Sequence, residues 1–172
     1  RALVDYCDER SLPLWLVSEQ RSRFNYHFND RVPVVMAEIH TEIPERCDLH
    51  TMLQEPVVKA VMFLTAQEVR EGPLSFMPHA RSTQWFIHGQ DIIPAEGGKL
   101  PAMRFIAEAN GWTPDELMAF GDSENDNEML RYAGTGVAMG NALEETKAAS
   151  DYVTDDCDDE GVAHALAHFA LI

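Results

Sequence analysis

The fold is decided by residues 120–130, which read Phe120-Gly121-Asp122-Ser123-Glu124-Asn125-Asp126-Asn127-Glu128-Met129-Leu130. A short apolar run before them, Leu117–Phe120, predicts a buried strand, and helical spacing predicts a helix over Asn125–Ala133. Asp122 therefore follows the carboxyl end of a strand, where open parallel sheets hold their ligands. Asp122 and Asp126 are four residues apart, so both can face one pocket as the chain turns into the helix. Because two neighbouring carboxylates repel each other, the pair favours a cation or a lysine between them.

The chemistry of this turn favours magnesium. Its candidate ligands are hard oxygens, with no His or Cys nearby, and such ligands suit Mg²⁺ better than zinc. An ordinary helix cap also uses Asp and Asn, and for either carboxylate alone that simpler interpretation is favoured. The complete string Gly-Asp-x-x-Asn-Asp after a buried strand indicates a site instead.

A lysine lies one predicted helix and one predicted strand upstream of this turn. Gly97-Gly98-Lys99 leads into a helix predicted over Pro101–Ala109. Beside flexible glycines at a helix start, a lysine can reach into a pocket and hold a phosphoryl group as a point charge. Taken alone, Lys99 would be a surface residue, but together with the downstream turn it is interpreted as part of the same site.

The C-terminal half alternates strands with helices, which favours a parallel, doubly wound α/β sheet. Its predicted strands are Leu117–Phe120, Gly136–Met139 and Tyr152–Thr154, and its predicted helices are Pro101–Ala109, Asn125–Ala133, Asn141–Ala149 and Gly161–Phe169.

The N-terminal half is different and predicts an α+β unit with a mixed sheet. A helix is expected at Leu3–Cys7, and strands are expected at Leu14–Val17, Val32–Val35, Ala60–Leu64 and Thr83–His88. Pro94, Gly97 and Gly98 cluster between residues 90 and 98, so the boundary is placed there, giving domains 1–90 and 91–172.

Composition narrows the classes of partner. The 172 residues contain 13 Lys+Arg and 29 Asp+Glu, a net charge of −16, which disfavours binding to nucleic acid. Apolar runs such as 60–66 are far shorter than the ~20 residues that span a bilayer, so no membrane partner is expected. The three cysteines, Cys7, Cys47 and Cys157, are read as free thiols in a reducing cytosol, which predicts a cytoplasmic protein.

Lys99 and the turn Gly121–Asp126 together resemble two motifs of the haloacid-dehalogenase-like (HAD) superfamily of phosphotransferases. More narrowly, the chain resembles the Cof-type sugar-phosphatase branch, subclass IIB, and segments 136–142, 149–154 and 159–162 are also similar. The resemblance implies a HAD-like Rossmannoid parallel sheet with an α+β cap. Residues 1–90 would be the cap, which sets substrate specificity, and residues 91–172 the C-terminal part of the catalytic core.

The resemblance also implies a role for each residue of the turn. Asp122 would bind Mg²⁺ directly, and Asp126 would bind the metal or orient both the metal and Lys99. Lys99 would neutralise the phosphoryl oxygens, and Asn125 would hydrogen-bond the substrate near its phosphate. The implied activity is Mg²⁺-dependent hydrolysis of small phosphorylated metabolites, mainly sugar phosphates, through an aspartyl-phosphate intermediate.

The family's nucleophile has no counterpart in this sequence. It is the first Asp of an Asp-x-Asp motif after the first core strand, whereas Val4–Asp8 has the wrong spacing and lies in a predicted helix. Asp156-Cys157-Asp158 has the spacing but is similar to the acidic loop before the family's last helix. The resemblance therefore implies that the first core strands precede Arg1, and that this part alone is inactive. A non-catalytic metal- or phosphate-binding module that lost its nucleophile is the alternative.

Overall fold

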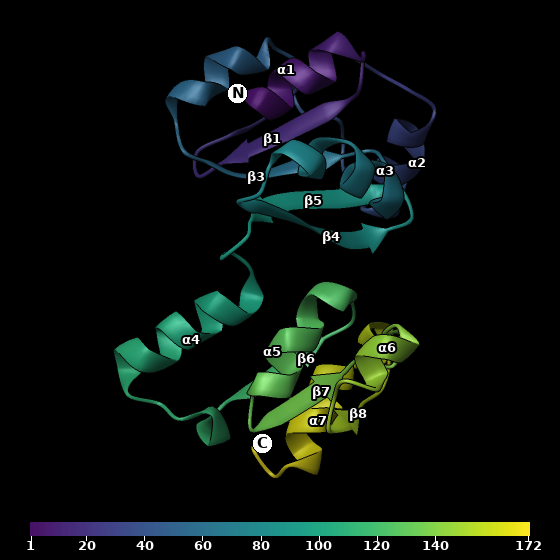
Figure 1. Cartoon of the computed structure of the whole chain (residues 1–172). Helices are drawn as coiled ribbons and strands as arrows, with labels where there is room; N and C mark the ends of the chain where they lie inside the picture. Colours follow the sequence, from purple (N-terminus) through teal and green to yellow (C-terminus); the bar gives the residue numbers. More distant parts are fainter. The chain divides into compact units, whose positions relative to one another are not determined.

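The computed structural model describes all of residues 1–172 and divides into two compact units, 1–96 and 97–172 (Figure 1). Each unit contains its own sheet, with five strands in the first and three in the second. The division falls within the segment 90–98, where the Pro and Gly residues cluster. The first unit extends past residue 90 because its last strand, β5 (Gly89–Pro94), pairs with the strands before it.

The sheet of the N-terminal unit is antiparallel throughout. Its order is β2-β1-β3-β5-β4, and the remaining strands are β1 (Leu14–Ser18), β2 (Ser22–Phe24), β3 (Val57–Met62) and β4 (Ala80–Phe86). The prediction of a mixed sheet is therefore wrong. Two pairs of neighbours, β1–β2 and β4–β5, are joined by short turns, and only antiparallel strands can be joined in that way.

Helices pack on both faces of this sheet. The helical elements are α1 (Ala2–Glu9), α2 (Arg31–Glu38) and α3 (Ala66–Glu71), with 3₁₀ helices η1 (Leu49–Gln54) and η2 (Pro73–Phe76). Successive residues of β3 point to opposite faces. Ala60 and Met62 belong to the core under α1 and η1, whereas Val61 belongs to a second core formed with α2.

The segment Val32–Val35 forms part of helix α2, so its prediction as a strand is wrong. Its β-branched residues suggested a strand, but the buried positions are Val32, Val35 and Met36, which is the spacing of one helix face. Asp30 occupies the N-cap position, and Pro33 lies in the first turn, where a missing N–H costs no helical hydrogen bond. Packing of that face against Phe24 and the sheet decides the conformation.

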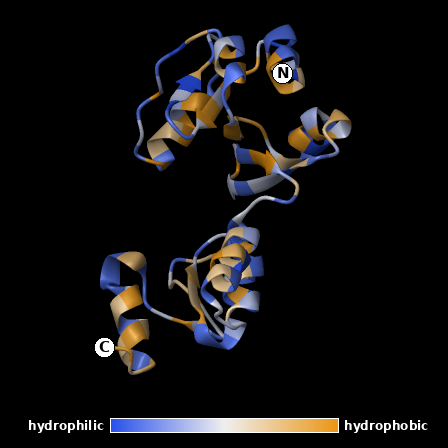
Figure 2. Ribbon diagram, turned by 90° about the vertical axis from the view of Figure 1, so that its left-hand side faces the viewer, coloured by the Kyte–Doolittle hydropathy of each residue, from blue (hydrophilic) through white to orange (hydrophobic).

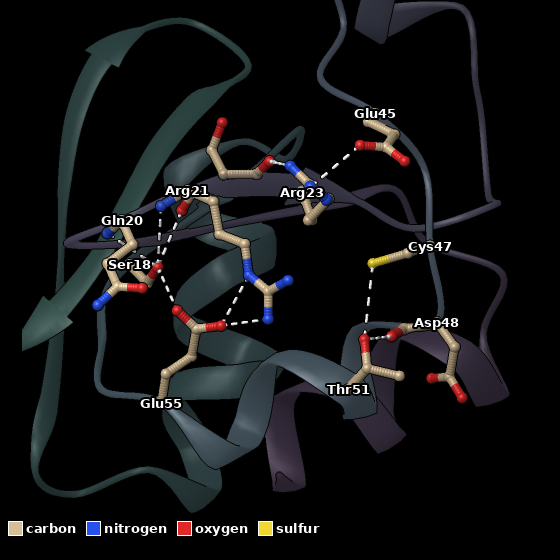
Figure 3. Close-up of polar contacts among 10 residues, drawn as sticks. Ser18, Gln20, Arg21, Arg23, Glu45, Cys47, Asp48, Thr51 and Glu55 are labelled. Atoms are coloured by element: carbon tan, nitrogen blue, oxygen red, sulfur yellow. Dashed lines mark hydrogen bonds and ion pairs between the residues drawn. The ribbon is translucent and has the colours of Figure 1, made fainter.

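A polar network fastens the β1–β2 turn to the end of η1 (Figure 3). The Oγ of Ser18 lies 2.8 Å from Oε2 of Glu55, and Arg21 donates from Nε to Oε1 of Glu55 at 2.7 Å. The hydrogen bond from Ser18 lowers the pKa of the Glu55 carboxyl most, and the hydrogen bond from Arg21 lowers it further below its ordinary value.

The C-terminal unit is a parallel α/β unit, as predicted. Its sheet has the order β6-β7-β8, formed by β6 (Met118–Gly121), β7 (Thr135–Ala138) and β8 (Tyr152–Val153). The helical elements are α4 (Lys99–Asn110), α5 (Asn127–Tyr132), α6 (Glu144–Lys147) and α7 (Gly161–His168), with 3₁₀ turns η3 (Pro114–Glu116), η4 (Glu124–Asp126) and η5 (Cys157–Asp159). Strand β6 stands at one end of the sheet, so one of its edges pairs with no other strand.

The apolar core of this unit is small. Ala119, Leu130 and Ala133 are buried together, whereas α4 buries only Ala107 and leaves Phe105 73% exposed. Figure 2 shows α7, which leads to the C-terminus, as orange and tan turns with few blue ones. None of the helices combines the length and the apolar composition that crossing a bilayer requires.

Candidate functional site

The site is built on the end of strand β6. Gly121 is the last residue of that strand, and a Cβ there would lie 2.7 Å from Cγ of Asp126. Only glycine therefore lets the strand end and Asp126 approach each other so closely. The backbone of the turn is fixed from outside, because Met139 N donates to Gly121 O at 2.9 Å and Leu143 N donates to Asp122 O at 3.1 Å.

Asp126 is the centre of the turn. Its side chain is 2% exposed, and both carboxylate oxygens have partners within the unit. Oδ2 accepts from the backbone N–H of Asp122 at 3.1 Å and of Ser123 at 3.3 Å, and Oδ1 pairs with the ammonium of Lys99. A buried charge is tolerated because it is paired and hydrogen-bonded in this way. Asp126 therefore shapes the turn and positions Lys99.

Lys99 reaches Asp126 from the first position of helix α4. Gly98 before it has φ 123°, a backbone conformation that residues other than glycine rarely adopt. Helix α4 packs against α5 and η4. This packing brings the first turn of α4 close to residues 121–126, which are called the acidic turn below. The Lys99 side chain is 49% exposed, so its ammonium is held on one side by Asp126 and is open to solvent on the other.

Asp122 and Asn125 supply the remaining polar groups. Asp122 is exposed, and its Oδ1 accepts from Ser123 Oγ at 3.2 Å. The Oδ1 atom of Asn125 is buried and has no hydrogen-bond partner within the protein. Because such a group usually finds a partner, Asn125 is suited to contact a ligand. The accessible carboxylate of Asp122 is a ligand that fits a hard divalent cation such as Mg²⁺.

The sequence did not single out two further polar residues. Asn127 opens α5 and Thr146 lies in α6, which packs against η4, and each has a buried side-chain oxygen without a hydrogen-bond partner. Their only sequence signal is a polar residue at a helix position that faces the interior.

The segment Asp156-Cys157-Asp158 lies apart from these groups in the chain. Asp156 is the N-cap of η5, and Cys157 and Asp158 are exposed residues of that turn, which precedes α7. The ligand atoms of the three residues lie within 4.8 Å of one another. This is the position that the resemblance implied for an acidic loop before the last helix. The segment Val4–Asp8 lies in α1, as predicted.

Known proteins resemble the chain along nearly its whole length. Putative phosphatase YkrA of Bacillus subtilis is 29% identical over 172 residues, which are 100% of this chain and 66% of that protein. A phosphoglycolate phosphatase of Methanothermobacter thermautotrophicus is 33% identical over 152 residues, covering 83% of this chain and 67% of that protein. A solved HAD subclass IIB sugar phosphatase superposes with a TM-score of 0.85 at 30% identity, over 99% of this chain and 65% of that one.

The chain thus spans 66% of the length of the first of these relatives, and the Cof-type, subclass IIB resemblance is confirmed. Residues 1–166 match the family of haloacid dehalogenase-like hydrolases. The predicted α/β fold class is confirmed by the same structural neighbours. With a match of this extent, the chain belongs to the haloacid dehalogenase-like hydrolase family.

Proposed function

We propose that the protein is a Mg²⁺-dependent phosphatase that hydrolyses phosphomonoesters of small metabolites, with sugar phosphates as its main substrate class. The observation that carries this proposal is the ion pair between Lys99 and Asp126 at the turn that also presents Asp122. It gathers a cation and an accessible carboxylate at the carboxyl end of a parallel strand. The phosphatase names of two relatives support hydrolysis of small phosphomonoesters, and the solved subclass IIB sugar phosphatase supports sugar phosphates among them.

Asp122 is proposed as the residue of this chain that binds Mg²⁺ directly. The sequence left open whether Asp126 binds the metal or orients the metal and Lys99. Because both oxygens of Asp126 already have partners, we assign it the orienting role. When bound, Mg²⁺ would neutralise negative charge on the phosphoryl oxygens.

Lys99 and Asn125 are proposed to hold the phosphoryl group. An ammonium has three protons, and the exposed side of Lys99 leaves donors beyond the one directed at Asp126. These donors would stabilise the charge that builds on the phosphoryl oxygens in the transition state. The side-chain amide N–H groups of Asn125 would donate hydrogen bonds to the substrate near its phosphate.

The nucleophile is proposed to come from outside the 172 residues. Aspartyl-phosphate chemistry needs a carboxylate nucleophile and a second carboxylate for proton transfer, both beside the metal. The unpaired edge of β6 offers backbone groups to one more parallel strand, and such a strand would end at the same edge of the sheet as Asp122. In this arrangement residues 97–172 are the C-terminal part of the core and residues 1–96 are the cap that restricts access to it.

The test is phosphatase activity of the complete gene product against a panel of phosphorylated metabolites, with Mg²⁺ and with EDTA. Activity should require Mg²⁺ and be abolished in Asp122→Asn, whereas Glu124→Gln, an exposed carboxylate of the same turn, should keep it. Lys99→Ala should lose about 2–4 kcal/mol of transition-state stabilisation, the usual scale for one preorganised donor.

Activity that survives EDTA or Asp122→Asn would contradict the proposal. Mg²⁺ binding without hydrolysis of any phosphomonoester would favour the non-catalytic module instead. The three free cysteines suit a reducing compartment, and we propose the cytoplasm as the location.

A further inference from the structure

A polar pocket of about 260 Å³ lies in the N-terminal unit, apart from any residue assigned above. Its titratable lining includes Asp8 from α1, His27 from the segment after β2, and Asp48 and His50 from the start of η1. The apolar side of α1 packs against Leu49 of η1 in the same region. The pocket therefore lies where three separate segments meet.

His50 is held between carboxylates on both sides of its ring. Its Nε2 lies 2.8 Å from Oδ1 of Asp5, and its Nδ1 lies 3.0 Å from Oδ1 of Asp48. Oδ2 of Asp8 is 3.9 Å from the same Nδ1. An ionised carboxylate only accepts hydrogen bonds, and a neutral imidazole has a single N–H. Both short contacts can therefore be hydrogen bonds only when His50 is protonated.

A second histidine extends the cluster. His27 Nε2 lies 3.1 Å from Oδ1 of Asp8, so Asp8 is within ion-pair distance of both rings. Three carboxylates thus face two imidazoles, and Tyr26 and Cys47 also line the pocket. When His50 is neutral, the carboxylates of Asp5 and Asp48 lose the positive charge that lies between them, whereas a protonated His50 donates to both.

We propose that Asp5, Asp8 and Asp48, with His27 and His50, form a proton-operated clamp that fastens α1 to η1 in mildly acidic solution and loosens it as the pH rises. The clamp joins elements that the apolar core already holds, so it adjusts the stability of α1 rather than creating it. A neutral His50 ring has a single N–H, so it can donate either to Asp5 of α1 or to Asp48 of its own segment, but not to both.

The directions of the pKa shifts agree with this geometry. Hydrogen bonds to Asp5 and then Asp48 raise the pKa of His50 above its ordinary 6.5. Because the pKa of His50 is higher in the folded than in the unfolded chain, its protonated ring stabilises the fold fully below the unfolded-state pKa. This stabilisation is lost as the pH rises through the folded-state pKa. The pKa of Asp48 is lowered from 3.8, first by the backbone hydrogen bond from His50, so acid weakens the cluster from the other side. The clamp is therefore strongest between pH 3.8 and pH 6.5, which are the ordinary pKa values of the Asp48 and His50 side chains.

The test is hydrogen exchange of the α1 amides in the 172-residue chain, expressed as protection relative to an unstructured peptide at each pH. The His50 side chain is 33% exposed, so its contacts have the strength of partly exposed ion pairs. We expect protection in α1 to be about threefold higher near pH 5.5 than near pH 8.5. His50→Gln should remove that difference. His164→Gln should retain it, because the His164–Asp155 pair, at 2.7 Å, lies in the other unit.

Protection of α1 that does not change with pH, or that changes equally in His50→Gln, would overturn the proposal. A second measurement stays decisive even if His50→Gln folds poorly. The ring protons of His50, followed by NMR, should titrate above 6.5, and Asp5→Asn should lower that midpoint. A midpoint at or below 6.5, or one unmoved in Asp5→Asn, would also overturn it.

Discussion

Replacing Asp126 with alanine should destabilise the C-terminal unit more than any other single change at the acidic turn. The substitution removes the acceptor of two backbone N–H groups, those of Asp122 and Ser123, and the partner of the Lys99 ammonium. The methyl group that replaces the carboxylate can accept none of these bonds. The turn after β6 would lose the contacts that define its shape.

The size of the loss follows from the exposure of each partner. Hydrogen bonds to a charged group contribute about 1.5–3 kcal/mol each, and the lower value applies here because water can reach the turn at exposed Asp122. Lys99 is 49% exposed, so its ion pair adds no more than about 1 kcal/mol. Two bonds and one ion pair then amount to about 3–4 kcal/mol. Asp126→Asn keeps one acceptor oxygen, so it should cost about half as much.

Native-state hydrogen exchange of the β7 amides measures the free energy of unfolding of this unit directly. Glu124→Ala is the matched control, because this carboxylate lies in the same turn and is exposed, and it should change that free energy by less than about 0.5 kcal/mol. A loss in Asp126→Ala no larger than that of the control would refute the reasoning that the buried carboxylate organises the turn.

Two further changes test other parts of the structure. Gly121→Ala places a methyl group 2.7 Å from Cγ of Asp126 and should cost about 1–3 kcal/mol by the same exchange measurement; an unchanged free energy would show that the turn has spare room. The hydrogen bond from Arg31 is the main cause that lowers the pKa of Glu68 to about 2, so its stabilisation is present above 4.5 and is lost as the pH falls toward 2. Glu68→Gln should flatten the acid limb of a pH series of urea unfolding for the N-terminal unit, and an acid limb as steep as before would contradict this.

The candidate site could be predicted because its determinants are local. Residues 117–130 supply an apolar strand, a glycine at its end and a helix after it, and these features place Asp122 and Asp126 at a strand terminus in any parallel sheet. The contact to Lys99, 27 residues away in sequence, followed from the resemblance and from the glycines before it. The roles of these residues stay predictions until activity is measured.

The N-terminal unit was harder to predict because its elements depend on packing. Helix α2 contains a run of β-branched residues that favours a strand locally, and only its buried face against Phe24 makes it a helix. Strand β5 lies in the segment that its Pro and Gly residues marked as a boundary, yet its residues pair with both β3 and β4. Of these two partners β3 is distant in sequence from β5, and such a pairing leaves no short-range signal.

The contact between Lys99 and Asp126 joins the first helical residue of the C-terminal unit to the middle of that unit. An anion bound at the open side of the ammonium would therefore be coupled to the folding equilibrium of the whole unit, because unfolding separates the two groups. By mass action, a ligand at a hundred times its dissociation constant would add about 2.7 kcal/mol. Melting-temperature screening of small phosphorylated compounds should thus reveal occupants of the site without any turnover.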